Sequence, residues 1–256
     1  MTITYEYEGA LYVNLTNRCN CNCVFCLRHG KAEGSIYPED FMANFKAHIL
    51  TASAGSGKTY SLAREYIYNT LRPQQDEELR RLALEHPKVR DIGEIGLDYY
   101  WKENPPKEFQ AQVFHRQMEL AEELKLPVII HDREAHQDCL NIVKSHPNVT
   151  GVYHCYSGSI EDAKTLVKMG WMISFTGVIT FKNARRSLEI IEWLPMEHIM
   201  VETDAPYLTP EPFRGKRNDS AKVRYMIEAI ANVKGMDPEE VARITLENGK
   251  RFFNIK

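Results

Sequence analysis

The sequence lacks the features of a membrane or exported protein. It has no apolar run of about 18 residues, the length that can span a bilayer, and its N-terminus lacks the basic start and apolar core of a signal peptide. It also lacks an excess of positive charge, because the formal net charge is -3. A basic field over the whole chain, which would attract nucleic acid without a specific site, is therefore excluded. We expect a cytoplasmic protein with no membrane partner.

Cysteine is sparse outside one short stretch. Four of the six cysteines fall within residues 19–26, and in a reducing compartment such a cluster indicates metal or iron-sulfur binding before disulfides.

Disorder is not expected, because 43% of the 256 residues are hydrophobic. This length suits one large α/β barrel or two small domains.

Four short apolar segments end on side chains that bind metals or move protons. In chain order these side chains are Glu94 with Asp98, His131 with Asp132, His154, and Glu202 with Asp204. Segments with helical periodicity separate the apolar segments, at residues 107–124, 160–169 and 183–194. An alternation of strand and helix, with reactive residues only at strand C-terminal ends, is typical of a TIM-like (β/α) barrel and its active site. We predict an α/β fold of this kind and a metal-assisted enzyme.

Residues 74–256 resemble one known family along their whole length. The segments GEIGLDYY, PVIIHDR, HCYSGS, ISFTGVITFKNA, VETDAPYLTPEP and RGKRND stand in this order and are similar to those of the TatD family of metal-dependent deoxyribonucleases. The resemblance implies a hydrolase that cleaves phosphodiester bonds of DNA through a metal-activated water. It also implies a divalent metal ion (Mg, Mn or Zn) as cofactor. We expect a monomer and infer no protein partner.

The resemblance assigns the metal site to Glu94, His131, His154 and Asp204. Of these, Glu94 and Asp204 are the catalytic candidates: Glu94 can bridge two cations, and Asp204 can bind metal and take a proton from water. Asp98 either supports the metal ligands from behind or caps a loop. A single histidine at a strand end is more often an ordinary hydrogen-bonded residue, but four such residues on consecutive strands favour a shared site.

Basic residues near the strand ends are candidates for holding the substrate's phosphates. They are Arg133, Arg214, Lys216 and Arg217, although the last three alone would also suit a solvated turn. Tyr207 can stack on a base or ribose. Four other histidines, His115, His136, His146 and His198, are interpreted as surface residues.

Residues 1–30 resemble a different family. Cys19, Cys23 and Cys26 follow the spacing C-x3-C-x2-C after a predicted strand, LYVNLT, and this pattern is similar to the cluster loop of radical SAM proteins. It implies a 4Fe-4S cluster that binds S-adenosylmethionine at its open iron. The alternative is a cysteine loop that is free or binds zinc adventitiously.

Residues 48–72 read as strand, glycine-rich turn and helix. The turn ASAGSGKT resembles the phosphate loop of UvrD-like helicases, with phosphate contacts from Gly55, Gly57, Lys58 and Thr59. A nucleotide hydrolase also needs an acidic residue on a second strand, and no apolar segment precedes the nearby acids at residues 76–78. We therefore do not expect ATP as a cofactor; anion binding or no ligand is favoured.

The chain departs from the TatD pattern before residue 74. A TatD-like chain opens with a strand bearing H-x-H, which completes one of two metal positions, and this sequence contains no H-x-H. We therefore expect one cation and weak activity, unless Cys19 or His48 supplies a substitute ligand.

Residues 1–73 and 74–256 are interpreted as two domains of a composite chain, with only seven predicted strands, so that the barrel is incomplete or altered in its N-terminal third. Alternatively, residues 1–73 imitate the first barrel units.

Two rival functions follow from the N-terminal resemblances. The first is a radical SAM protein whose cluster is held by Cys19, Cys23 and Cys26, with the barrel as a fused part. The second is a non-catalytic nucleotide- or nucleic-acid-binding module that uses Lys58 and the arginine loop.

Overall fold

The computed structural model describes residues 3–7, 10–14, 80–81, 83–85, 89–102 and 104–255, without the side chains of residues 3–14. The cysteine loop and the phosphate loop lie outside the described residues, as do Cys19, Cys23, Cys26, His48 and Lys58. The described part of the chain contains all of the TatD-like motif segments, from GEIGLDYY to RGKRND.

Among the described residues, five parallel strands form the main sheet. They are β3 (Ile92–Asp98), β4 (Val128–Arg133), β5 (Gly151–Tyr153), β6 (Met172–Phe175) and β7 (Ile199–Val201). Each strand pairs with the next in chain order, β3-β4-β5-β6-β7. Sequential parallel pairing with helical crossovers is the arrangement of a (β/α) barrel, so the predicted fold class is confirmed.

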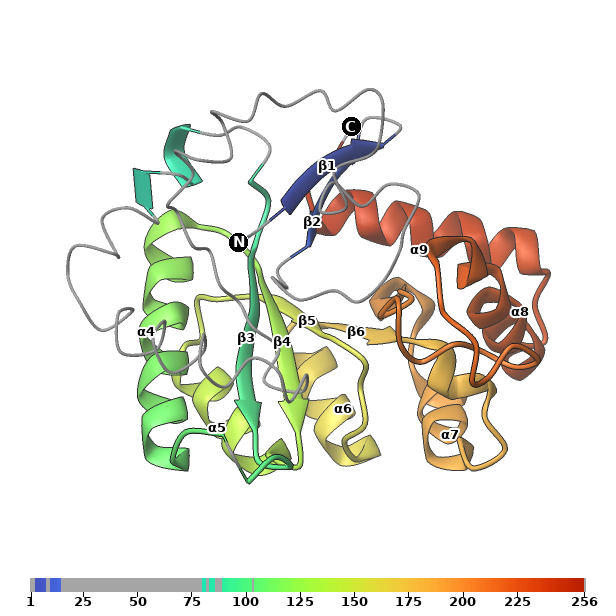
Figure 1. The fold of residues 1–256 in the computed structure, drawn as a ribbon, viewed down its shortest axis with the longest axis horizontal. Coiled ribbons are helices and arrows are strands. Elements are labelled where there is room, and N and C mark those ends of the chain that lie inside the picture. Colours follow the sequence, from blue (N-terminus) through green and yellow to red (C-terminus); the bar gives the residue numbers. More distant parts are fainter. Residues whose placement is uncertain are drawn as a thin grey trace.

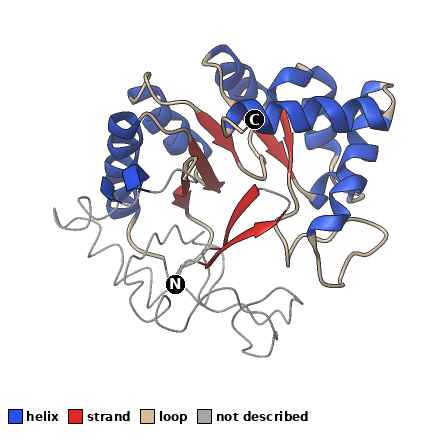
Figure 2. Ribbon diagram, turned by 90° about the horizontal axis from the view of Figure 1, so that it is seen from above, coloured by secondary structure: helices blue, strands red, loops and turns tan. Residues whose placement is uncertain are grey.

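Within the described residues, six α-helices follow or separate these strands. They are α4 (Lys107–Leu124), α5 (His136–Ser145), α6 (Ile160–Lys168), α7 (Arg185–Trp193), α8 (Val223–Lys234) and α9 (Pro238–Phe252). Short 3-10 turns occupy Gly177–Thr180, Met196–His198 and Ser220–Lys222. Figure 2 shows the helices around the outside and the strands towards the centre, and Figure 1 shows their order along the chain.

A second, two-stranded sheet lies at the N-terminus. It pairs β1 (Ile3–Tyr7) with β2 (Ala10–Asn14) in antiparallel register. The predicted strand LYVNLT overlaps β2, whereas β1 was not predicted. The antiparallel pairing differs from the parallel pairing that a barrel unit uses.

Strand periodicity gives the main sheet two faces with different surroundings. Along β4, Val128 and Ile130 are fully buried against the helices, whereas Ile129 and His131, which alternate with them, are half-buried. The large core between sheet and helices contains Phe114 and Trp171, neither of which is exposed. A small separate cluster of Val152, Met172 and Met200 packs with Ile129, Phe252 and Phe253. Alternate residues of one strand therefore enter different environments.

Polar side chains fix the ends of two helices. The Ser159 hydroxyl accepts a hydrogen bond from the Asp162 N–H at the start of α6 (3.0 Å), as an N-cap residue does. In α9, buried Asn248 donates from its Nδ2 to the carbonyls of Met196 (2.7 Å) and Ile199 (2.8 Å). Asn248 thereby ties the last helix to the start of β7.

Gly96 allows β3 and β4 to approach closely. Its φ is +135°, and a Cβ at this position would lie 2.0 Å from the His131 carbonyl oxygen. Only glycine tolerates both the backbone angle and the contact. Gly96 also pairs with His131 in the strand register, so this glycine brings the end of β3 beside the histidine of β4.

Candidate metal centre

Three side chains from neighbouring strands converge at the C-terminal end of the sheet. Glu94 belongs to β3, His131 to β4, and His154 directly follows β5. Their candidate ligand atoms all lie within 4.8 Å of one another, and all three residues are half-buried. The Glu94 Oε2 atom is buried and has no hydrogen-bond partner among the described residues. A buried carboxylate oxygen without a partner is costly, and a divalent cation between these three ligands would satisfy it.

His131 is held between two carboxylates. Its Nδ1 lies 3.8 Å from Glu94 Oε2, and its Nε2 lies 3.2 Å from Asp98 Oδ2. Asp98 is fully buried, and its Oδ1 accepts a hydrogen bond from the Tyr100 N–H (3.0 Å). The two interpretations of Asp98 from sequence are thus compatible, because one oxygen faces the histidine and the other caps the loop.

His154 has a corresponding pair of carboxylates, Glu202 and Asp204. Its Nδ1 is hydrogen-bonded to Glu202 Oε2, and its Nε2 lies 3.9 Å from Asp204 Oδ1. The other oxygen of Glu202 accepts the Cys155 N–H (2.8 Å). The two histidines therefore turn different nitrogens towards the cluster, Nδ1 of His131 and Nε2 of His154.

Glu202 was expected at a strand end with Asp204 but was not assigned to the metal site. It stands two positions before Asp204, directly after β7 (Ile199–Val201), and residues two apart in an extended segment face the same side. That spacing was the available signal. Its contacts show that it orients His154 and the backbone of Cys155 together.

The clustered charges shift several pKa values. Burial opposes protonation of His154, yet Glu202 and Glu94 outweigh it and hold the pKa of His154 well above its usual value. Burial would raise the pKa of Glu202, but His154 holds it below its usual value. Burial raises the pKa of Asp204 to about 7, opposed by His154 and reinforced by Glu94. The site thus contains more carboxylates than imidazoles, and this excess of negative charge favours binding of a cation.

A buried asparagine holds the loop that carries Asp204. Asn218 is 1% exposed, and its Nδ2 donates to the carbonyls of Thr203 and Tyr207 (2.7 Å to the latter). Tyr207 itself is 59% exposed. The loop is therefore fixed from within while Tyr207 faces solvent.

The basic candidates lie at the same end of the sheet but not in the metal cluster. Arg133 ends β4, and its guanidinium lies 4.2 Å from the centre of the Tyr100 ring. Arg214 lies over the Phe181 ring at 4.3 Å. Lys216 and Arg217 are exposed in the loop after β7.

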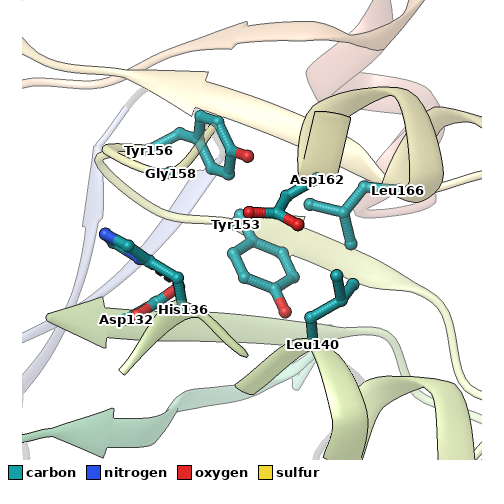
Figure 3. Close-up of a pocket in the computed structure, with 8 residues that line it drawn as sticks. All are labelled: Asp132, His136, Leu140, Tyr153, Tyr156, Gly158, Asp162 and Leu166. Atoms are coloured by element: carbon teal, nitrogen blue, oxygen red, sulfur yellow. Dashed lines mark hydrogen bonds and ion pairs between the residues drawn. The ribbon is translucent and has the colours of Figure 1, made fainter. Parts of the chain in front are cut away.

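A narrow crevice lies between the sheet and its helices (Figure 3). It is lined by Asp132, His136, Leu140, Tyr153, Tyr156, Gly158, Asp162 and Leu166. Asp132 and Tyr153 are the chain neighbours of His131 and His154, so they point to the opposite face of the sheet. The crevice is too narrow for a molecule of water, so it is no substrate site.

The interpretation of four histidines as surface residues is wrong. His136 Nδ1 bonds Asp132 Oδ2 (2.9 Å), His198 Nδ1 meets the Trp171 carbonyl (2.8 Å), and all four rings are half-buried. The remaining two, His115 and His146, contact each other with 3.0 Å between their nitrogens. The local sequence pattern indicated the secondary structure that carries these histidines, but not the residues that cover them.

Within the described residues, none of the helices combines the length and apolar character needed to cross a membrane.

Comparison with known proteins supports the same chemistry. A family model described as TatD related DNase matches residues 40–254, a range that begins before the residue 74 expected from the motifs. The chain is 48% identical over 172 residues to the uncharacterized metal-dependent hydrolase YabD of Bacillus subtilis, covering 66% of this chain and 67% of that one. It is 40% identical over 185 residues to the uncharacterized metal-dependent hydrolase YcfH of Escherichia coli, covering 72% and 69%.

Among solved structures, the crystal structure of the TatD homolog YjjV from Escherichia coli superposes with a TM-score of 0.68 at 27% identity. It covers 78% of this chain and 82% of that one. The radical SAM and helicase resemblances gain no support from these comparisons. The chain belongs to the TatD family of metal-dependent hydrolases.

Proposed function

We propose that this protein is a deoxyribonuclease that hydrolyses phosphodiester bonds of DNA. The observation that carries the proposal is the convergence of Glu94, His131 and His154, with one carboxylate oxygen buried and without a hydrogen-bond partner among the described residues. A divalent cation (Mg, Mn or Zn) at these residues supplies positive charge next to a phosphate and makes a coordinated water more acidic.

The residues around the cluster take separate roles. Asp204, 3.9 Å from His154 Nε2, contacts the metal site and accepts the proton of the attacking water. Glu94 is the central ligand. Glu202 holds the imidazole of His154 in place through its Nδ1.

Exposed basic and aromatic side chains bind the rest of the substrate. Arg133 contacts a phosphate next to the scissile bond, and Arg214, Lys216 and Arg217 contact phosphates farther along the strand. Tyr207, which is largely exposed, stacks on a base or ribose. Because these basic side chains lie at one end of the sheet, they can bind nucleic acid there although the net charge of the whole chain is -3.

The DNA substrate is inferred from the family, whose model is described as TatD related DNase. The relatives YabD and YcfH are named only as metal-dependent hydrolases, which agrees with the site. We assign the hydrolase activity to residues 74–256 and treat residues 1–73 as a separate segment. Without an H-x-H pair in the sequence, we expect one cation and slow turnover.

Cleavage of labelled single- and double-stranded DNA in the presence of Mn²⁺ or Mg²⁺ tests the proposal. Wild-type protein and Tyr153→Phe, a variant on the opposite face of the sheet, should cleave DNA and lose the activity in a chelator. Glu94→Gln should not cleave. Cleavage of a simple phosphodiester or another ester, with DNA left intact, would contradict the DNA assignment and keep the metal site. Cleavage by Glu94→Gln at the wild-type rate would contradict the site.

A further inference from the structure

Asp98 is a buried carboxylate whose two oxygens do different work. Its side chain is 0% exposed; Oδ1 accepts the Tyr100 N–H at 3.0 Å, and Oδ2 faces His131 Nε2 at 3.2 Å. A carboxylate oxygen accepts hydrogen bonds, so its contact favours the form of His131 with hydrogen on Nε2. In that form Nδ1 carries a lone pair, and Nδ1 is the nitrogen that faces Glu94.

The backbone of Asp98 is held as firmly as its side chain. Gln110 from α4 accepts the Asp98 N–H (3.0 Å) and donates from its Nε2 to the Asp98 carbonyl (3.1 Å) and the Pro105 carbonyl (2.8 Å). Asn104 also donates to the Asp98 carbonyl (3.0 Å). Gln110 is itself 8% exposed. A buried network in which each member is bonded holds its geometry.

We propose that Asp98 is a positioning residue, held in place by Gln110, which keeps His131 turned with a free Nδ1 towards the metal cluster. The inference rests on the metal site of the proposed function and assigns to that site an orienting group on the far side of His131. Carboxylates that accept the second N–H of a ligand histidine fix its orientation and increase its basicity.

The substitution Asp98→Asn separates this role from packing because the two side chains have nearly the same shape. The amide has one oxygen, and the Tyr100 N–H needs an acceptor. With the oxygen kept there, the NH₂ group faces His131 Nε2 and must donate to it, which moves the ring hydrogen to Nδ1. A protonated Nδ1 cannot bind a metal ion.

The experiment measures Mn²⁺ affinity of full-length wild-type, Asp98→Asn and Asn104→Ala proteins by calorimetry or electron paramagnetic resonance. We expect Asp98→Asn to weaken Mn²⁺ binding about 10- to 100-fold, the range for changes behind a metal ligand. Asn104→Ala removes a hydrogen bond to the same residue but leaves the carboxylate in contact with His131. It should lower the melting temperature of the metal-free protein and keep Mn²⁺ affinity within about twofold of the wild-type value. Equal losses in both variants would contradict the inference.

Nitrogen-15 NMR of the His131 ring in metal-free protein gives a readout that altered stability alone would not move. The hydrogen should be on Nε2 in the wild type and on Nδ1 in Asp98→Asn; the same form in both would overturn the proposal. Equal Mn²⁺ affinities of the wild type and Asp98→Asn would also overturn it. Failure of the wild type itself to bind Mn²⁺ would instead remove the metal site on which the proposed function rests.

Discussion

The two faces of the main sheet carry similar side chains in different states. On β4 and just after β5, His131 and His154 point inward, while their neighbours Asp132 and Tyr153 point outward to the helices. The outward Asp132 is hydrogen-bonded to His136 in a crevice without room for a ligand. The inward pair meets Glu94, whose buried oxygen has no hydrogen-bond partner among the described residues. Residue type alone therefore does not mark the site; the side of the strand decides which groups can take a cation.

The strongest test of this comparison substitutes neighbours on opposite faces. His154→Ala removes a proposed metal ligand and leaves Glu202 without its imidazole. We expect metal affinity to fall on the order of 100-fold or more, a larger loss than most substitutions of residues that support a metal ligand cause. DNA cleavage should be abolished. Calorimetry with Mn²⁺ and a cleavage assay measure both.

Tyr153→Phe is the matched control. The Tyr153 hydroxyl is buried without a hydrogen-bond partner among the described residues, so its removal should be neutral or slightly stabilising. Metal affinity should stay at the wild-type value. A loss of Mn²⁺ binding in Tyr153→Phe as large as that in His154→Ala would show that the two faces are not independent.

Gly96→Ala should disturb both faces at once. A Cβ at Gly96 would meet the His131 carbonyl at 2.0 Å, and the φ of +135° disfavours alanine. We expect a loss of about 3 kcal/mol or more in the free energy of unfolding, measured by urea denaturation, together with weaker metal binding. The control is Gly235→Ala, where the φ is +62° and nothing lies within 4 Å. Equal losses in the two variants would point to backbone angle alone as the cause.

Asn248→Ala tests the outer helices without touching the site. It leaves the carbonyls of Met196 and Ile199 without their side-chain donor, at a cost of about 2 kcal/mol. Metal affinity of the folded variant should not change. A drop in affinity at a temperature well below its melting point would mean that α9 helps to shape the inner face.

The smallest effect concerns pH. The hydrogen bond to Asp132 raises the pKa of His136, against an opposing effect of burial. The stabilisation is therefore complete below the unfolded-state pKa and is lost as pH rises through the folded-state pKa. His136→Gln should cost about 0.5 kcal/mol near pH 5.5, the range of partly exposed ion pairs, and less near pH 8.5. Thermal melts at the two pH values measure this difference, and an equal cost at both would contradict the charge on His136.

Periodicity in the sequence predicted most elements of the barrel. The expected helix at residues 107–124 has the same bounds as α4, and α6 and α7 end within a few residues of their predictions. The strand ends also supplied Glu94, His131 and His154, because apolar runs that stop on such residues meet at one edge of a parallel sheet. These features depend on local order along the chain.

Contacts between distant residues were not predictable from that order. The pairing of Glu202 with His154 depends on which way each side chain faces at its strand end and on the segments between the two strands. The strand β1 has no strong alternation to distinguish it, and its antiparallel partner was predicted as a barrel strand. The cysteine and phosphate loops stay predictions, because they lie outside the described residues.

The most direct test of the central claim is the number of divalent ions per chain after chelation and reconstitution with Mn²⁺, followed by gel filtration and elemental analysis. A metal centre on the face of the sheet that carries His131 and His154 predicts about one Mn²⁺ per chain in the wild type and in Tyr153→Phe, and almost none in His154→Ala. Equal Mn²⁺ in all three proteins, or none in the wild type, would contradict a metal centre at Glu94, His131 and His154.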